Sequence, residues 1–198
     1  MHSIFQNKKI IVTGHTGFKG SWLSIWLNML GAKVFGISNK VPTSPSHYEL
    51  HKNVFYKDLR YDVRNLDDIK NCLVEIKPDF IFHLAAQPIV IKSYEDPKET
   101  FETNTMGSLN ILEALKSLKN KCIGVFITSD KCYENLEWQY GYRENDLLGG
   151  KDPYSASKAT TEIILNCYYN SFFKNSTNVQ IGRARAGNVI GGGDWTQS

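Results

Sequence analysis

The segment that most constrains the fold is KKIIVTGHTGFKG, residues 8–20. Its apolar, β-branched first half ends at a glycine, which is typical of a buried strand. The residues that follow carry an apolar stripe at helical spacing: Trp22, Ile25, Trp26, Met29 and Leu30. Gly31 stands just past this stripe, where helices commonly end. A strand, a glycine turn and a helix in this order favour a βαβ unit.

The same alternation continues along the chain. Five further strands are predicted, at 32–38, 53–58, 79–86, 122–128 and 178–185. Helical stripes lie at 66–76 and 111–118, and a third helix begins at Asp152-Pro153, an N-cap followed by a favourable first residue. Strands that alternate with amphipathic helices predict an α/β fold, with a doubly wound, mainly parallel, Rossmann-like sheet and helices on both faces. Ligands bind such sheets beyond the carboxyl ends of the strands.

Composition narrows the function classes. The 198 residues include 23 Lys and Arg against 20 Asp and Glu, so the net charge is only +3, and it is scattered. This predicts no nucleic-acid partner. No apolar run is long enough for a membrane span, and the four cysteines have no metal-site spacing, so neither a membrane nor a metal is expected. We expect a cytoplasmic protein.

The glycine turn is the first candidate site. Gly14, Gly17 and Gly20 lie between strand and helix, where backbone N–H groups can approach a pyrophosphate at the positive end of the helix. Asp62 follows the third strand and is placed to accept a hydrogen bond from an adenine amino group, although a plain turn aspartate explains it nearly as well. His15, inside the turn, either contacts a phosphate or faces solvent.

The second candidate is YSASK, in which Tyr154 and Lys158 share one helix face. An adjacent ammonium favours the phenolate, which lets tyrosine act as a base toward an alcohol or sugar hydroxyl. A third feature is TSDK, 128–131, at the end of an apolar strand. Ser129, Asp130 and Lys131 there supply a hydroxyl, a carboxylate and an amine.

Bland readings stand beside several of these residues. Asp130-Lys131 can be a surface ion pair, although their place at a strand end favours catalysis. Thr128 and His83 are predicted to be core residues without a catalytic role. Thr103 and Asn104 are predicted to begin a helix, which N-capping explains.

Together these motifs, with LAAQP (84–88) and RAGNVIGGGDW (185–195), resemble the extended short-chain dehydrogenase/reductases. Within that family the strings GHTGFKGSW, TSDKCY and AGNVIGGGDW resemble the 4,6-dehydratases that act on CDP-glucose. The Asp-Lys pair is the specific mark, because the related dTDP-glucose dehydratases carry Asp-Glu. The likeness covers essentially all 198 residues.

The resemblance implies a role for each position. Tyr154 takes the proton of the sugar's 4-hydroxyl, Lys158 holds the nicotinamide ribose and lowers the pKa of Tyr154, and Ser129 binds the 4-oxygen. Lys131 removes the C5 proton, and Asp130 protonates the departing 6-hydroxyl. The implied NAD-binding residues are Gly14, Thr16, Gly17, Phe18, Gly20, Asp62, Leu84, Ala85, Ala86, Tyr154 and Lys158. Gln87, Arg185 and Asn188 are implied to bind the nucleotide sugar, with Arg185 on its diphosphate.

Two features depart from the family pattern. The second strand ends in Ser38-Asn39-Lys40, with no carboxylate for a ribose 2′-hydroxyl, and Lys40 would tolerate a 2′-phosphate. NAD is still favoured over NADP, because the cofactor is recycled within each turnover. The family's chain also continues into a smaller substrate domain. Residues 1–184 are therefore expected to form the NAD-binding domain and 185–198 the truncated start of the nucleotide-sugar region, in a form with weak turnover.

Other functions remain open at this stage. A 4-epimerase or a reductase of the same fold needs Tyr154 and Lys158 but not the Asp-Lys pair. A non-catalytic cofactor-binding sensor would not need the intact catalytic set. The helical faces at 111–118 and 163–169 are either a homodimer seam or core packing.

Overall fold

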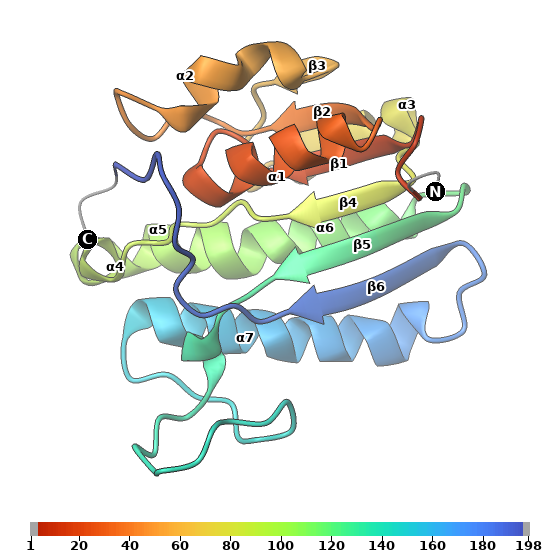
Figure 1. The fold of residues 1–198 in the computed structure, drawn as a ribbon. Coiled ribbons are helices and arrows are strands. Elements are labelled where there is room, and N and C mark those ends of the chain that lie inside the picture. Colours follow the sequence, from red (N-terminus) through yellow and green to blue (C-terminus); the bar gives the residue numbers. More distant parts are fainter. Residues whose placement is uncertain (1–3, 196–198) are drawn as a thin grey trace.

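The computed structural model describes residues 4–195, which form a six-stranded parallel sheet with the order β3-β2-β1-β4-β5-β6 (Figure 1). The strands are β1 (Lys9–Thr13), β2 (Lys33–Ile37), β3 (Lys57–Leu59), β4 (Phe80–His83), β5 (Cys122–Ile127) and β6 (Val179–Ala184). The order reverses between β1 and β4, so the carboxyl ends of these two neighbours form the switch point at which doubly wound sheets bind ligands. The predicted fold class is confirmed.

Helices lie on both faces of the sheet (Figure 1). They are α1 (Phe18–Met29), α2 (His47–His51), α3 (Leu66–Ile76), α4 (Val90–Glu95), α5 (Pro97–Phe101), α6 (Gly107–Lys116) and α7 (Pro153–Tyr168). On one face, α3, α6 and α7 bury an apolar cluster that includes Ile11 and Phe126. On the other face, α1 packs Leu27 against Ile10 and Val34.

The two halves of the sheet are covered to different degrees. In β1, Ile10 and Ile11 point to opposite faces and both are fully buried. In β5, Phe126 is buried under the helices, but Ile123, which points to the opposite face, is 43% exposed. The helical layer on the α1 side therefore covers β1 and β2, whereas in the described residues no helix covers that face of β5.

The α1 helix is present as predicted, but its apolar stripe faces outward. Trp22, Trp26 and Met29 are exposed by 46%, 63% and 79%. The buried side instead consists of Gly20, Ser21, Ser24 and Leu27. Small residues are needed there because the helix begins against the backbone of the glycine turn.

Two other elements differ from the sequence prediction. Strand β3 begins at Lys57 rather than at residue 53, because Lys52–Val54 form a 3₁₀ turn. The helix predicted to begin at Thr103-Asn104 begins at Pro97, where Asp96 is the N-cap, and it runs through a π-helical turn, Glu102–Met106, into α6. The N-cap interpretation of Thr103 and Asn104 is therefore wrong.

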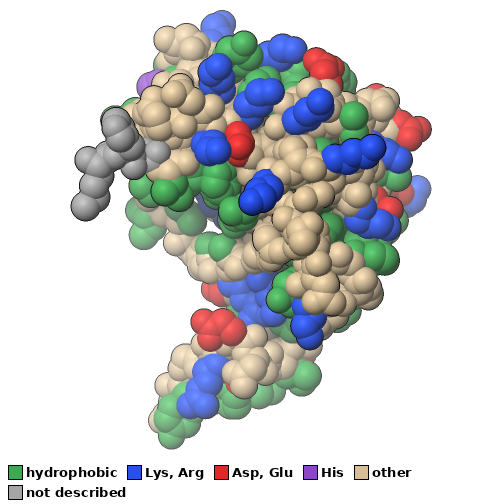
Figure 2. Space-filling view, turned by 90° about the vertical axis from the view of Figure 1, so that its right-hand side faces the viewer, with side chains coloured by type: hydrophobic (Ala, Val, Ile, Leu, Met, Phe, Trp, Pro, Cys, Tyr) green, Lys and Arg blue, Asp and Glu red, His purple; other side chains and the backbone are tan. Residues whose placement is uncertain are grey.

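Two long segments extend from the carboxyl edge of the sheet. Residues 133–152 connect β5 to α7 and form the projection at the bottom of Figures 1 and 2. Residues 186–195 run from β6 back to α1 (Figure 1), where the Trp22 indole donates to the carbonyl oxygen of Gly192 at 2.9 Å. Trp22 also stacks on His47, with ring centroids 4.5 Å apart. The segment after β6 thus meets α1, the element that follows the glycine turn.

The face of the molecule at the amino ends of the strands carries charges of both signs. Figure 2 looks onto the amino ends of the strands, where Lys and Arg side chains are spread among acidic, polar and apolar groups rather than joined into one patch. Among the described residues, no helix has the length and apolar character needed to span a membrane.

Candidate active site

The glycine turn between β1 and α1 is held by close backbone contacts. Gly14 has a φ of +73°, and a Cβ on it would lie 2.8 Å from the backbone nitrogen of Ala85. A Cβ on Gly20 would lie 2.1 Å from the carbonyl oxygen of Gly14. Gly17, the N-cap of α1, has room for a Cβ at 3.4 Å from the same oxygen. Gly14 and Gly20 are therefore required for the fold of the turn, whereas Gly17 is left to face a ligand at the positive end of α1.

The residues after β4 lie against this turn. The backbone nitrogens of Leu84 and Ala85 both donate to the hydroxyl oxygen of Thr13, at 3.2 and 3.1 Å. Leu84, Ala85 and Ala86 are half-buried. The ends of β1 and β4 are thereby joined into one edge of the site.

His83 is a core residue, which confirms the sequence interpretation. Ser108 donates to the carbonyl oxygen of Asn104 at 2.6 Å, so its oxygen accepts from Nε2 of His83 at 3.0 Å. Nδ1 of His83 is then the acceptor for the Thr13 hydroxyl at 2.7 Å. Burial, aided by repulsion from Lys158, lowers the pKa of His83 to about 3, so the ring is neutral.

Thr16 and Phe18 connect the turn to its surroundings. The Thr16 hydroxyl lies 2.7 Å from the Ser38 hydroxyl and 2.7 Å from the carbonyl oxygen of Lys40. Phe18 is half-buried, and its ring lies under Gly191. The turn is thus tied to the end of β2, where the adenosine ribose is expected.

His15 neither faces solvent nor is free to bind a phosphate, so both sequence interpretations are wrong. Its side chain is fully buried behind the turn, with Nε2 2.9 Å from a carboxylate oxygen of Asp58. The ring fills the space left by Gly36, whose Cβ would lie 2.3 Å from it. Burial lowers the pKa of His15. The residue is part of the packing between β1, β2 and β3.

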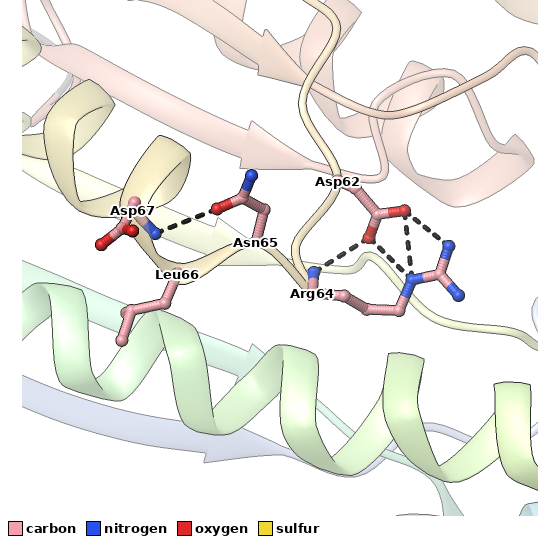
Figure 3. Close-up of a pocket in the computed structure, with 5 residues that line it drawn as sticks. All are labelled: Asp62, Arg64, Asn65, Leu66 and Asp67. Carbon is pink, nitrogen blue, oxygen red and sulfur yellow. Dashed lines mark hydrogen bonds and ion pairs between the residues drawn. The ribbon is translucent and has the colours of Figure 1, made fainter.

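Asp62 lies at an open hollow of about 570 Å³ at the start of α3. Figure 3 shows its carboxylate facing the guanidinium of Arg64, which donates from Nη2 at 2.7 Å and from Nε at 3.0 Å. Asn39 donates to the same carboxylate at 3.2 Å. The hydrogen bonds of Arg64 lower the pKa of Asp62 to about 2, so it is an anion at neutral pH. The hollow is lined by Asp62, Arg64, Asn65, Leu66 and Asp67.

The residues after β5 form a short 3₁₀ turn, Asp130–Cys132. The Ser129 hydroxyl caps this turn by accepting from the backbone nitrogen of Lys131 at 3.2 Å, and it donates to Asp130 at 3.1 Å. The backbone nitrogen of Asp130 donates to the carbonyl oxygen of Ala186 at 3.1 Å. Ser129 is buried, whereas Asp130 and Lys131 are exposed. The turn therefore presents the carboxylate and the amine to the ligand edge.

Tyr154 and Lys158 lie on the first turns of α7, where Asp152 is the N-cap and accepts from the backbone nitrogen of Ser155 at 2.9 Å. The ammonium of Lys158 is 6.0 Å from the centroid of the Tyr154 ring. A side-chain hydrogen bond joins Tyr154 to Ser129, and the charge of Asp130 acts on the phenol. The helix and the turn after β5 thus bring Tyr154 close to Ser129, Asp130 and Lys158, whereas the side chain of Lys131 has no contact with them among the described interactions.

The expected effect of Lys158 on Tyr154 is not found. Burial raises the pKa of Tyr154, and the hydrogen bond with Ser129 only partly opposes this. Burial and repulsion from Lys19 lower the pKa of Lys158 to about 8. Both groups lose solvation in this part of the site, and for a phenol that loss works against the charged form.

Lys19 is a site residue that the sequence analysis missed. It lies in the first turn of α1, and its charge acts on both Asp130 and Lys158. Burial lowers the pKa of Lys19, whereas Asp130 opposes that shift. Its position between Phe18 and Gly20, inside the glycine motif, was the available signal.

Two hydrogen bonds join the side chain of Asn104 to the backbone of Gln87, in the loop after β4. Asn104, on the π-helical turn, accepts from the backbone nitrogen of Gln87 at 2.7 Å and donates to its carbonyl oxygen at 3.1 Å and to Ser157 at 2.9 Å. The Gln87 side chain bonds to Ile89 and Thr100. Gln87 therefore shapes the loop after β4 with its own amide, and Asn104, given no role beyond N-capping, ties that loop to α7.

Arg185 does not face the ligand edge. Its Nη2 is 2.9 Å from Glu162, and its Nη1 donates to the carbonyl oxygen of Glu144 at 3.0 Å. Because Glu162 is fully buried and both bonds go to the protein itself, the guanidinium is already occupied, and the expected diphosphate contact of Arg185 stays a prediction. Asn188, in contrast, is exposed on the segment after β6.

Comparison with known proteins decides the family. The profile of the GDP-mannose 4,6 dehydratase family matches residues 11–183. The chain belongs to this family. It is 48% identical, over 98% of its length, to CDP-glucose 4,6-dehydratase of Salmonella typhimurium.

Solved structures of similar proteins agree with the fold. The chain is 29% identical to UDP-glucose 4-epimerase of Thermus thermophilus, solved in complex with NAD, with a TM-score of 0.76 over 89% of this chain and 54% of that one. An epimerase from Methanothermobacter thermautotrophicus matches 98% of this chain and 55% of its own, with a TM-score of 0.81 and 24% identity, which supports the fold alone.

The chain spans about half the length of these relatives, including 56% of the Salmonella protein. Within this length, the chain places the glycine turn, the hydroxyls of Ser129 and Tyr154, and the turn that carries Asp130 and Lys131 at one edge of the sheet. Such an arrangement can bind a dinucleotide and move protons on and off a sugar ring.

Proposed function

We propose that the chain is the cofactor-binding and catalytic part of an NAD-dependent nucleotide-sugar 4,6-dehydratase, a hydro-lyase, with CDP-glucose as substrate. One observation carries the proposal. Tyr154 hydrogen-bonds Ser129, and the next two residues of the same turn are a carboxylate and an amine. This is the set of groups needed to oxidise a hydroxyl and then eliminate water. The 48% identity to the Salmonella enzyme supports this choice.

The residues fit a dinucleotide. At Gly14 and Gly20 a Cβ would collide with neighbouring backbone atoms. Gly17, beside the amino end of α1, has room for one and is accessible to a ligand. We propose that Thr16 and Phe18 line the path of the phosphates, that Asp62 receives the adenine, and that Leu84, Ala85 and Ala86 lie along the nicotinamide half. When bound, NAD would take two electrons and a hydrogen from C4 of the sugar and return them at C6 within the same turnover.

The chain's own groups perform the proton transfers. Tyr154 accepts the proton of the 4-hydroxyl while Ser129 donates a hydrogen bond to the 4-oxygen. Lys158, with its pKa of about 8, is mostly protonated at pH 7 and can hold the nicotinamide ribose by donating hydrogen bonds, whereas the hydrogen bond with Ser129 is what favours the Tyr154 phenolate against burial. These three side chains lie on two rigid elements, which keeps their geometry fixed through the reaction.

The second stage uses the turn after β5. Once C4 is a ketone, the C5–H bond is acidified, and Lys131 removes that proton. Asp130 protonates the departing 6-hydroxyl, which leaves as water, so a C5–C6 double bond forms. A proton returned to C5 with reduction at C6 gives the 4-keto-6-deoxy sugar. The sum of these steps is the loss of one water molecule.

NAD is preferred to NADP in this proposal. Asn39, at the end of β2, donates to the carboxylate of Asp62 at 3.2 Å, so this end of the strand lies beside an anion and not beside a second cation. The epimerase from Thermus was solved with NAD, and it is 29% identical to this chain. Release of NADP rather than NAD from the denatured protein would contradict this choice.

We further propose a homodimer through α7. The face at 111–118 is closed, because Ile111, Leu112 and Leu115 are fully buried in the core. Ile163 on α7 and Phe172 just beyond it are 58% and 49% exposed. Light scattering should show a dimer that Ile163→Glu dissociates.

The test is incubation of the protein with CDP-, dTDP- and GDP-hexoses, followed by mass spectrometry of the sugar nucleotide. Loss of one water from CDP-glucose is the expected result. Asp130→Asn should abolish this loss, because the 6-hydroxyl then has no acid. If the protein is instead a 4-epimerase of the same fold, Asp130→Asn leaves its activity in place and the mass does not change.

A further inference from the structure

Glu162 is a fully buried carboxylate that the proposed reaction does not use. It lies on α7, one turn after Lys158 and two turns after Tyr154. A buried charge is costly unless it is paired and hydrogen-bonded. Glu162 therefore needs the partners that surround it, and their positions in the chain indicate its role.

All of its partners come from the two strands beside the catalytic turn. The Thr128 hydroxyl, at the end of β5, donates to one carboxylate oxygen. Nε of Arg183 and Nη2 of Arg185, from β6 and the residue after it, lie 3.0 and 2.9 Å from the other oxygen. Each oxygen is thus assigned to one strand.

These contacts bracket the turn that carries the proposed acid and base. Thr128 directly precedes Ser129, so the Glu162 contact fixes the point where the turn leaves β5. On the other side, Arg185 directly precedes Ala186, whose carbonyl oxygen accepts from the backbone nitrogen of Asp130 at 3.1 Å. One carboxylate on the helix of Tyr154 and Lys158 therefore holds both backbones that position Asp130.

Arg185 extends the network into the loop 133–152. Its guanidinium carbon lies 4.7 Å from the centroid of the Tyr133 ring, and Nη1 donates to the carbonyl oxygen of Glu144 at 3.0 Å. The side chain is only 11% exposed. The Arg185 guanidinium is thus occupied by Glu162, Glu144 and Tyr133, and it shares the single negative charge of Glu162 with Arg183.

We propose that Glu162 is a positioning residue of the dehydratase, which sets the Ser129–Asp130–Lys131 turn against Tyr154 and Lys158 through Thr128 and Arg185. The inference rests on the proposed function, because only a reaction that uses both groups requires their alignment. A displacement of about 1 Å in such a group lowers rates by roughly a hundredfold. The charge of Glu162 also raises the pKa of Lys158, in opposition to burial.

The test compares Glu162→Gln, which keeps the size and removes the charge, with Glu75→Gln as the control. Glu75 is an exposed carboxylate on α3 that pairs with Lys57 at 3.4 Å, far from the site. The measurements are kcat and KM for CDP-glucose, NAD affinity, the thermal midpoint, and amide hydrogen exchange of residues 128–133.

For Glu162→Gln we expect kcat to fall by about 10- to 100-fold, with KM and the NAD dissociation constant within about threefold of wild type. Hydrogen exchange at Ser129–Tyr133 should become faster in the folded protein. Glu75→Gln should leave all four measurements unchanged. A Glu162→Gln protein with normal kcat and normal exchange, but a lower thermal midpoint, would show a purely structural role and overturn the proposal.

Two further variants keep the proposal falsifiable if Glu162→Gln does not fold. Thr128→Val removes only the bond to β5, and Arg185→Lys keeps the charge but loses the fork of donors. Each should lower kcat by about 3- to 10-fold and speed exchange in the turn, and unchanged kcat and exchange in both would overturn the proposal. If the wild-type protein dehydrates no nucleotide sugar, the proposed function fails, whereas the exchange data alone still report whether Glu162 orders the turn.

Discussion

The glycine turn after β1 and the turn Asp130–Cys132 after β5, which we propose to be the catalytic turn, lie at the same edge of the sheet, yet different forces hold them. At the glycine turn, backbone lies directly on backbone: Gly20 on Gly14, and Gly14 on Ala85. At the turn after β5, polar side chains from other elements, and not direct backbone contacts, hold the backbone in place. Glu162 bonds to Thr128 and two arginines.

The difference follows from what each turn presents to a ligand. Backbone N–H groups reach a phosphate only if no side chains intervene, so close packing and function ask for the same residue, glycine. An acid and a base must be partly exposed to act, and an exposed turn cannot be fixed by packing alone. Buried hydrogen bonds and ion pairs from behind replace that packing.

The largest expected effect tests the close backbone packing of the glycine turn. Gly20→Ala places a Cβ 2.1 Å from the carbonyl oxygen of Gly14, and neither backbone can move without disrupting β1 or α1. We expect a loss of about 4 kcal/mol or more in the free energy of unfolding. Urea denaturation measures it. Gly17→Ala is the matched control, since its Cβ has room at 3.4 Å, and it should keep wild-type stability while weakening NAD binding.

The next variant is expected to raise the free energy of unfolding, and it tests the polar contacts around the turn after β5. The pKa of Lys158 is about 8 when folded and 10.5 for a free side chain. The folded protein therefore binds this proton more weakly, so the lysine lowers stability fully below pH 8, and the penalty fades between pH 8 and 10.5. Lys158→Met should unfold at higher urea at pH 7, by up to about 3 kcal/mol, and should be inactive.

That gain should shrink when the same unfolding curves are recorded near pH 10. If Lys158→Met is less stable than wild type at pH 7, the ammonium of Lys158 contributes favourably to the free energy of unfolding, and the prediction is wrong.

A smaller effect concerns the buried ring of His83, which hydrogen-bonds Thr13 and Ser108. Its pKa is about 3 in the folded protein, against 6.5 for a free histidine. The unfolded chain takes up a proton that the folded one refuses, so stability is full above pH 6.5 and falls as the pH drops toward 3. The loss from His83 at pH 5 is about 2 kcal/mol. Burial also lowers the pKa of His15, which adds a loss of the same sign.

Denaturation curves between pH 7 and 5 measure this loss. In His83→Gln the decline over that range should be shallower than in wild type by the contribution of one histidine. An unchanged decline would mean that His83 is protonated within the folded protein.

The smallest effect tests which side of α1 supports the glycine turn. Trp26 is 63% exposed, so Trp26→Ser should change the free energy of unfolding by less than about 0.5 kcal/mol. Leu27, the neighbouring residue, is 1% exposed, and Leu27→Ala should cost about 2–5 kcal/mol. Thermal unfolding of the two variants makes the comparison. Equal losses would mean that the apolar stripe of α1 is also packed.

The sequence predicted those parts of the molecule that depend on local chemistry. The β-branched runs, the glycine turn, and Asp152-Pro153 at the start of α7 need only their own neighbours, and each lies where it was expected except β3, which begins at Lys57 instead of residue 53. The apolar stripe of α1 correctly indicated a helix. Its orientation was not readable, because the need for small residues at Gly20, Ser21 and Ser24 arises only from contact with the distant glycine turn.

What the sequence could not supply were the partners of charged residues. Arg185 was assigned to a diphosphate and His15 to a phosphate or to solvent, because a charge with no visible partner suggests a ligand. Their partners, Glu162 and Asp58, are 23 and 43 residues away. Pairings at such separations are set by the order of the strands, which no local pattern encodes.

The π-helical turn Glu102–Met106 makes the protein sensitive to chain length between α5 and α6. The extra residue shifts the phase of the helix by roughly 100° between α5 and α6. Removing a single residue there would restore a regular spiral, rotate α4 and α5 about its axis, and turn Asn104 away from Gln87 and Ser157. Such a deletion would keep Tyr154, Lys158 and Asp130 but would break the hydrogen bonds of Asn104 that support the loop after β4. Deletions within residues 102–106 should therefore be more damaging than most substitutions there.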